Sequence, residues 1–166
     1  TFESKKGVGS TFVIRVPFKI DLDADKREES KDVSEKSIKG MHVLLAEDNE
    51  LNMEIAEFLL QNEGAEVTKA WNGQEIVELF RKSEAGEFDV ILMDIMMPII
   101  NGYEATKRIR SLDREDAKKI PIIAMTANAF TEDRIRAKEA GMDEHVAKPI
   151  DVELLIKVIH KLVKHN

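Results

Sequence analysis

The feature that most constrains this sequence is a regular alternation of short apolar runs with longer amphipathic stretches between residues 40 and 166. Short continuous apolar runs are typical of strands buried on both faces, and the stretches between them have the length and spacing of helices. Repeated strand–helix units predict an α/β domain in which helices cover both faces of a parallel sheet. We predict strands at 42–46, 65–70, 89–93, 121–125 and 144–147, and helices at 50–62, 73–85, 102–110, 131–140 and 151–164.

The first forty residues differ from this pattern. Residues 1–20 contain a glycine-rich turn, from Gly7 to Ser10, followed by an apolar segment that ends at Phe18 and predicts one strand. Residues 21–39 carry 12 charged side chains among 19 and few apolar ones, which predicts a linker. The chain is therefore expected to comprise a short β segment at 1–20, a linker at 21–39 and an α/β domain at 40–166.

Composition and charge argue against several classes of protein. Asp94 interrupts the most apolar stretch, so no membrane contact is expected, and the chain start lacks the basic-then-apolar pattern of a signal peptide. The absence of cysteine excludes a disulfide framework and thiolate chemistry. Residues 41–166 carry 16 basic and 24 acidic side chains, and such a domain is a poor direct binder of nucleic acid, whose phosphates attract basic surfaces.

Chemically versatile side chains follow four of the predicted strands. In an open α/β sheet, the carboxyl ends of parallel strands meet at one edge, which is where function collects. Clustered carboxylates repel one another, so a cation or protons must compensate. Oxygen ligands with no nearby His or Cys favour Mg²⁺. The residues at this edge are Glu47 and Asp48 after the first strand, Asp94 at the end of the third, Thr126 after the fourth and Lys148 after the fifth.

A carboxylate beside Mg²⁺, with a lysine and a hydroxyl nearby, is suited to accept a phosphoryl group. Two other classes share this topology. A Mg²⁺-dependent phosphatase usually places its Asp nucleophile after the first strand, where this chain has Glu47-Asp48-Asn49. A flavin-binding domain needs a phosphate-cradling loop at the same place, and the two acidic residues there would repel the phosphate.

Four segments of residues 40–166 resemble the motifs of a response-regulator receiver domain, in order and at the expected strand ends. They are 44–49 (LLAEDN), 91–102 (ILMDIMMPIING), 124–128 (AMTAN) and 148–149 (KP). The resemblance implies a flavodoxin-like (CheY-like) three-layer α/β sandwich with a five-stranded parallel sheet of order 2-1-3-4-5 and five helices. That order places the first and third strands side by side.

The resemblance also implies roles for the metal-binding residues. Asp94 is the expected phosphoacceptor. Glu47 and Asp48 are expected to bind Mg²⁺ together with Asp94, and the backbone carbonyl of Met96 is expected to be a further ligand.

Further roles follow from the same resemblance. Thr126 is expected to bond the phosphoryl oxygens, and Lys148 to pair with one of them as a point charge. His145 takes the switch position that acts with Thr126, where the family more often has Tyr or Phe. The Lys148–Pro149 peptide bond is expected to be cis. Met96 and Asn128 are expected to border the path of the water that hydrolyses the aspartyl phosphate.

Residues 3–18 are similar to the closing strands of a histidine-kinase ATPase domain, without the motifs that bind ATP. The whole chain thus resembles part of a hybrid histidine kinase in a cytoplasmic phosphorelay. The resemblance leaves open whether the parent chain is anchored in a membrane. The resemblance implies a phosphoacceptor module with self-phosphorylation and self-dephosphorylation chemistry, in a parent chain that is a histidine protein kinase. Whether the segment itself counts as an enzyme stays open.

The implied partners are the histidine-bearing helical domain of the chain's own kinase and a histidine phosphotransfer protein, both docking on helix 50–62. This helix has more apolar residues than one buried stripe needs. We expect Ile55, Phe58 and Leu59 to face the sheet. We expect a surface near Asn52, Ala56 and Leu60 to face a partner.

Overall fold

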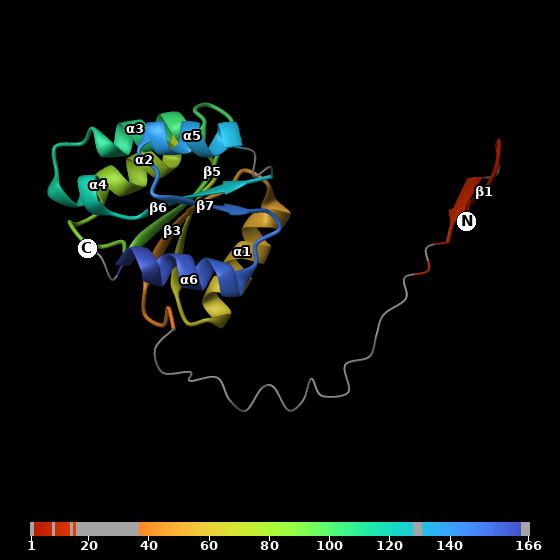
Figure 1. The fold of residues 1–166 in the computed structure, drawn as a ribbon, viewed down its shortest axis with the longest axis horizontal. Helices are drawn as coiled ribbons and strands as arrows, with labels where there is room; N and C mark the ends of the chain where they lie inside the picture. Colours follow the sequence, from red (N-terminus) through yellow and green to blue (C-terminus); the bar gives the residue numbers. More distant parts are fainter. Residues whose placement is uncertain (1, 8, 14, 16–36, 128–130, 164–166) are drawn as a thin grey trace. The chain divides into compact units, whose positions relative to one another are not determined.

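The computed structural model describes residues 2–7, 9–13, 15, 37–127 and 131–163, and divides the chain into two compact units, Thr1–Asp32 and Val33–Asn166 (Figure 1). The larger unit contains a parallel sheet of five strands in the order β4-β3-β5-β6-β7. This is the predicted order 2-1-3-4-5. The strands are β3 (His42–Ala46), β4 (Glu66–Ala70), β5 (Val90–Asp94), β6 (Ile122–Thr126) and β7 (Glu144–Ala147).

Helices cover both faces of this sheet, so the predicted three-layer sandwich is confirmed (Figure 1). The described residues form six helices, however, and not the predicted five. The extra helix, α4, has five residues and buries only Ala117, so it has too little apolar periodicity to be recognised in the sequence. The helices are α1 (Glu50–Asn62), α2 (Gly73–Lys82), α3 (Gly102–Arg110), α4 (Glu115–Lys119), α5 (Thr131–Ala140) and α6 (Val152–Val163).

Helix α2 ends three residues earlier than predicted. Ser83 has an extended backbone, and its hydroxyl donates to the Phe80 carbonyl at 2.7 Å, which satisfies a carbonyl at the helix end. Strands β4, β5 and β6 each begin one residue later than predicted. Strands β5 and β6 also end one residue later than predicted, so Asp94 and Thr126 are the last residues of their strands and not the residues just beyond them.

The core lies in two layers, because alternate residues of each buried strand point to opposite faces. On one face Leu44, Ile91 and Ile122 pack with buried side chains of α2, α3 and α4. On the other, Leu45 and Leu92 pack with buried side chains of α1 and α6. Strands β5 and β6 are buried over their whole length, as their continuous apolar sequence predicts.

Helix α1 has the predicted bounds, but its predicted orientation is wrong. Met53, Ala56 and Leu60 are buried against the sheet, whereas Ile55 and Phe58 are exposed. A helix that is apolar on several sides does not reveal its rotation from sequence alone. Packing of the narrow Met53–Ala56–Leu60 stripe in the buried layer that contains Leu45 and Leu92 decides that rotation.

The smaller unit is an antiparallel hairpin of β1 (Phe2–Lys5) and β2 (Gly9–Phe12), with Phe2 opposite Phe12. We predicted one strand after the turn; the structure adds a strand before it. Gly7 has a φ of 80°, a left-handed conformation that glycine adopts without steric cost. The predicted continuation of the strand to Phe18 falls largely on residues outside the described part of the chain.

The segment just before β3 is tied to the larger unit. The side chain of Ile38, which we assigned to the linker, is fully buried in the layer beneath α1. The Gly40 amide donates to the Gly64 carbonyl at 2.8 Å. The Lys148–Pro149 bond is cis, as expected. Among the described helices, none is long and apolar enough to cross a bilayer.

Candidate functional site

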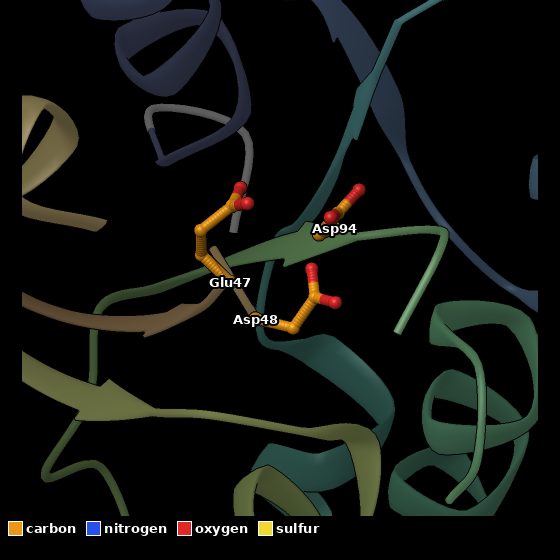
Figure 2. Close-up of side chains that lie close together, drawn as sticks. All are labelled: Glu47, Asp48 and Asp94. Carbon is orange, nitrogen blue, oxygen red and sulfur yellow. The ribbon is translucent and has the colours of Figure 1, made fainter. Parts of the chain in front are cut away.

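Three carboxylates meet where β3 and β5 end. Glu47 and Asp48 directly follow β3, and Asp94 is the last residue of β5. The two strands are neighbours in register, with Ala46 opposite Met93. Each carboxylate offers an oxygen that lies within 4.8 Å of the other two. Figure 2 shows Glu47, Asp48 and Asp94 gathered at this edge of the sheet.

The Lys148 side chain brings a positive charge to these carboxylates from the loop after β7. Its Nζ lies 2.9 Å from Asp94 Oδ2 and 2.5 Å from Glu47 Oε2. Glu47 is 2% exposed and Asp94 5% exposed, so both carboxylates need a partner to remain ionised away from water. Lys148 therefore compensates two buried negative charges at once.

The environment shifts the pKa of two of these groups. Burial raises the pKa of the Asp94 carboxyl; the hydrogen bond and charge of Lys148 oppose this rise, and the Glu47 carboxylate adds to it. Burial lowers the pKa of the Lys148 ammonium, but its hydrogen bonds to Glu47 and Asp94 outweigh burial and raise it overall. Lys148 therefore stays charged, while Asp94 holds its negative charge less readily than an exposed aspartate does.

Glu47 has a second set of hydrogen-bond partners in the first turn of α1. The Asn52 side-chain amide donates to Glu47 Oε1 at 3.0 Å, and the Asn49 backbone amide donates to the same oxygen at 3.4 Å. Asn49 is the N-cap of α1, and its side chain accepts from the Asn52 backbone amide at 3.1 Å. Sequence reasoning did not assign Asn52 to the site; its position three residues after a capping Asn is the signal that could have found it.

The other predicted site residues lie on the neighbouring strands and loop. Thr126 is the last residue of β6 and is buried. Its neighbour across the β6–β7 ladder is Ala147, whereas His145 lies opposite Ala124, with its Nδ1 3.2 Å from a Glu144 carboxylate oxygen.

Met96 also lies beside the phosphoacceptor candidate. Its backbone amide donates to Asp94 Oδ1 at 3.3 Å, and its side chain is 79% exposed. Asn128 lies outside the described residues.

Two glycines hold the loop between Asp94 and α3 in place. A Cβ on Gly102 would lie 2.3 Å from the Asp94 carbonyl oxygen, and one on Gly73 would lie 2.2 Å from the Ile100 carbonyl oxygen. Side chains at either position would therefore push the backbone of this loop away. The Gly102 amide also donates to the Ile95 carbonyl at 2.9 Å. Close packing of this kind fixes the backbone around Asp94.

The donor set of this edge suits a small hard cation. Glu47, Asp48 and Asp94 offer only carboxylate oxygens, and Asp48 is exposed, which leaves room for bound water. Mg²⁺ prefers oxygen ligands, uses one or two carboxylates directly and keeps several waters. The residues therefore fit Mg²⁺ better than a metal that selects nitrogen or sulfur ligands.

Near this edge, α1 presents an apolar surface to solvent, formed by Leu51, Ile55 and Phe58. They follow one another at spacings of four and three residues, so they share one side of the helix. Phe58 is 68% exposed and Leu51 64% exposed. A group of large, exposed apolar side chains on one side of a helix marks a candidate protein-binding surface.

Comparison with protein families gives one match over most of the larger unit. Residues 43–160 match the family model described as "Response regulator receiver domain". Histidine kinase 1 of Arabidopsis thaliana is 34% identical over 161 residues, and hybrid signal transduction histidine kinase I of Dictyostelium discoideum is 41% identical over 120. These alignments cover 79% and 71% of this chain but only 13% and 7% of the relatives.

Solved structures show the same fold. The receiver domain of a sensor histidine kinase from Pseudomonas aeruginosa PAO1, with a magnesium ion coordinated in its active-site cleft, is 35% identical with a TM-score of 0.68. The match covers 75% of this chain and 98% of that one. A co-crystal structure of the Saccharomyces cerevisiae phosphotransfer protein Ypd1 with the receiver domain of Ssk1 matches at 28% identity and a TM-score of 0.68, over 76% of this chain and 90% of that one.

Proposed function

This chain belongs to the response regulator receiver domain family, and from that premise we propose that Asp94 accepts a phosphoryl group from a phosphohistidine and passes it on. The observation that carries this proposal is the position of Asp94 at the end of β5, held between the Lys148 ammonium and two further carboxylates. The family match also favours a receiver over the phosphatase and the flavin-binding domain considered from the sequence.

The transfer replaces one bond by another. An Asp94 carboxylate oxygen attacks phosphorus in line, the bond between phosphorus and the imidazole nitrogen breaks, and that nitrogen keeps the electron pair. Lys148, now 2.9 Å from Asp94 Oδ2, is near enough to pair with a phosphoryl oxygen once Asp94 is modified. We assign Thr126 the role of a hydrogen-bond donor to the same group, and His145 that of the switch residue on β7.

We also propose that Glu47, Asp48 and Asp94 hold Mg²⁺, with the Met96 carbonyl as a further ligand. The clustering of the three carboxylates supports this, as does the magnesium ion in the Pseudomonas receiver. When bound, Mg²⁺ neutralises charge on the phosphoryl oxygens during transfer.

The larger protein is a further proposal, because the chain spans 13% or less of the two kinases described above. We propose that it is part of a hybrid histidine kinase, in which 1–20 is the end of an ATPase domain and 21–39 a linker. A helical histidine-bearing domain, or a phosphotransfer protein as in the yeast complex, would dock on the apolar surface of α1. The cytoplasmic location expected for such a relay stays a proposal.

Phosphorylation with a small-molecule donor tests the central proposal. The chain is incubated with acetyl phosphate and Mg²⁺, and its intact mass is measured for the wild type, Asp94→Asn and Asp113→Asn, a control at an exposed aspartate outside the site. We expect one added phosphoryl group in the wild type and the control, and none in Asp94→Asn. Equal modification of all three proteins would refute the role of Asp94, and rapid turnover of a generic phosphate ester would favour a phosphatase.

A further inference from the structure

The most buried charged group of the site, Glu47, has two carboxylate oxygens with different partners. Oε2 lies 2.5 Å from the Lys148 ammonium, and Oε1 accepts from the Asn52 side-chain amide at 3.0 Å. The Asn49 backbone amide makes a longer contact of 3.4 Å with Oε1. The two side-chain partners approach from different directions, so together they fix the plane of the Glu47 carboxylate.

The backbone of Asn52 is itself fixed with respect to the strand end. The N-cap Asn49 accepts from the Asn52 backbone amide at 3.1 Å, so the first turn of α1 is tied to the loop that carries Glu47 and Asp48. The amide of the short Asn52 side chain on this turn reaches Glu47 directly, without a long flexible side chain. The capped helix therefore holds this donor at a set distance from the carboxylate.

The two partners differ in how they behave toward a cation. The Lys148 ammonium carries a positive charge, so it competes with a metal ion for the carboxylates that it contacts. The Asn52 amide is neutral, and it can keep donating to Oε1 while the other oxygen turns to a metal or to a metal-bound water. Hydrogen bonds from such neighbouring groups orient the ligands of metal sites.

We infer that Asn52 is a positioning residue for the magnesium site: it holds the Glu47 carboxylate in the orientation that binds the ion. This inference rests on the proposed Mg²⁺ site and deepens it. Substitution of groups that orient metal ligands typically costs about 10–100-fold in metal affinity. Because Asn52 is exposed, we expect a loss near the lower end of this range, about tenfold.

The test is calorimetric titration of the full chain with MgCl₂, for the wild type, Asn52→Ala and Asn52→Gln. The control is Gln61→Ala, which removes another exposed side-chain amide of α1 whose Nε2 donates to a carboxylate, that of Glu57, at 3.3 Å. Asn52→Ala should weaken Mg²⁺ binding about tenfold, Asn52→Gln should recover part of the loss, and Gln61→Ala should bind as the wild type does. Thermal unfolding without Mg²⁺ should be nearly the same for all four proteins.

Two results would overturn the inference: wild-type affinity in Asn52→Ala, or an equal loss in Gln61→Ala. A drop in the metal-free melting temperature that accounts for the lost affinity would likewise show a role in folding only. These results leave the proposed function intact as long as the wild type takes up phosphate on Asp94. Failure of the wild type itself to bind Mg²⁺ would refute the metal site and this inference with it.

Discussion

Lys148 Nζ lies 2.9 Å from Asp94 Oδ2, although Asp94 ends β5, Lys148 follows β7, and β6 lies between these two strands in the sheet. From the loop after β7, the lysine side chain reaches both Asp94 and Glu47. In the metal-free protein it therefore supplies positive charge that Mg²⁺ would supply in the loaded one.

Lys148→Met should destabilise the metal-free protein, because it leaves two nearly buried carboxylates without their cation. Loss of one partner of a buried ion pair costs about 3–5 kcal/mol, and we expect about 2 kcal/mol here since the site opens to solvent. Mg²⁺ should restore more stability to this variant than to the wild type. Urea denaturation with EDTA and with Mg²⁺ measures both effects.

Lys161→Met is the matched control. Lys161 lies on the exposed side of α6, and its Nζ lies 3.4 Å from a carboxylate oxygen of Glu144 on β7. It should change stability by less than about 1 kcal/mol, with or without Mg²⁺. If Lys148→Met lost equal stability in both conditions, the lysine would not be acting in place of the metal ion.

The exposed surface of α1 should govern transfer from a protein donor but not from a small molecule. Ile55→Glu and Phe58→Glu each place a charge on this surface. We expect transfer from a phosphohistidine partner to slow about tenfold or more, which corresponds to a loss of at least about 1.4 kcal/mol of binding free energy at the interface. Phosphorylation by acetyl phosphate should be unchanged. Rapid-quench assays with a histidine phosphotransfer protein measure the transfer rate.

Ile135→Glu is the control for this experiment, because Ile135 is also exposed but lies on α5. The Ile135→Glu variant should accept phosphate from the phosphohistidine partner at the wild-type rate. If Ile135→Glu slows transfer while the α1 variants do not, the partner docks on the other face of the sheet.

How far the sequence predicts this fold depends on how local the determining contacts are. The predicted bounds of helix α1 are confirmed to the residue, and the structure shows local determinants at both ends: Asn49 caps the start, and Gly64, with a φ of 84°, follows the end. The predicted rotation of α1 was wrong because the rotation depends on packing against the sheet, which no local pattern encodes. The buried anchor Ile38 was missed for the same reason: one apolar residue in a charged segment gives no periodic signal.

The site was more predictable than the helix faces. Asp94 and Lys148 come together because parallel strands carry their carboxyl ends to one edge, so strand order alone brings the two residues close. Asn52 could not be assigned in this way. Its role depends on a hydrogen bond to Glu47, and an Asn in the first turn of a helix has many other uses.

The chain should lose stability in acid partly through Asp116, whose pKa is lowered to about 2, mainly by its hydrogen bond from Arg114. The folded pKa is depressed, so this contribution is fully present above the ordinary pKa near 4 and is lost as the pH falls toward 2. The shift corresponds to at most about 2 kcal/mol, and solvent screening reduces it. Asp116→Asn should therefore destabilise the protein by about 1 kcal/mol at pH 7 and by much less at pH 2.5.

Urea denaturation at the two pH values checks this, with Glu115→Gln as a control. Glu115 belongs to the same short helix, and its carboxylate lies 3.5 Å from Lys119 with both side chains largely exposed. Its replacement should have little effect at either pH. An Asp116→Asn penalty that is as large at pH 2.5 as at pH 7 would mean that Asp116 does not stabilise the protein through its carboxylate charge.

Removal of residues 1–36 should leave the larger unit nearly as stable as before, whereas Ile38→Ala should cost about 2–4 kcal/mol. Ile38 is fully buried beneath α1, and truncation of a buried Ile leaves a cavity. Ser37→Ala is the neighbouring control at an exposed residue. Thermal and urea denaturation of the three proteins decide the point, and a loss of several kcal/mol on removing 1–36 would show that the N-terminal segment supports the fold.

The lifetime of phosphorylated Asp94 should be long, and Met96 is the residue to change. Hydrolysis needs a water held in line with phosphorus, and the 79% exposed Met96 side chain lies two residues after Asp94 with only a weak thioether acceptor to offer. Met96→Asn or Met96→Glu supplies a good acceptor, and one hydrogen bond of about 1 kcal/mol gives roughly fivefold faster loss of phosphate. Ile99→Asn makes a similar change at a 75% exposed position farther along the same loop and should leave the half-life unchanged. Intact mass measured over time after removal of acetyl phosphate follows the decay, and unchanged or slower decay in both Met96 variants would show that this side chain does not limit the approach of water.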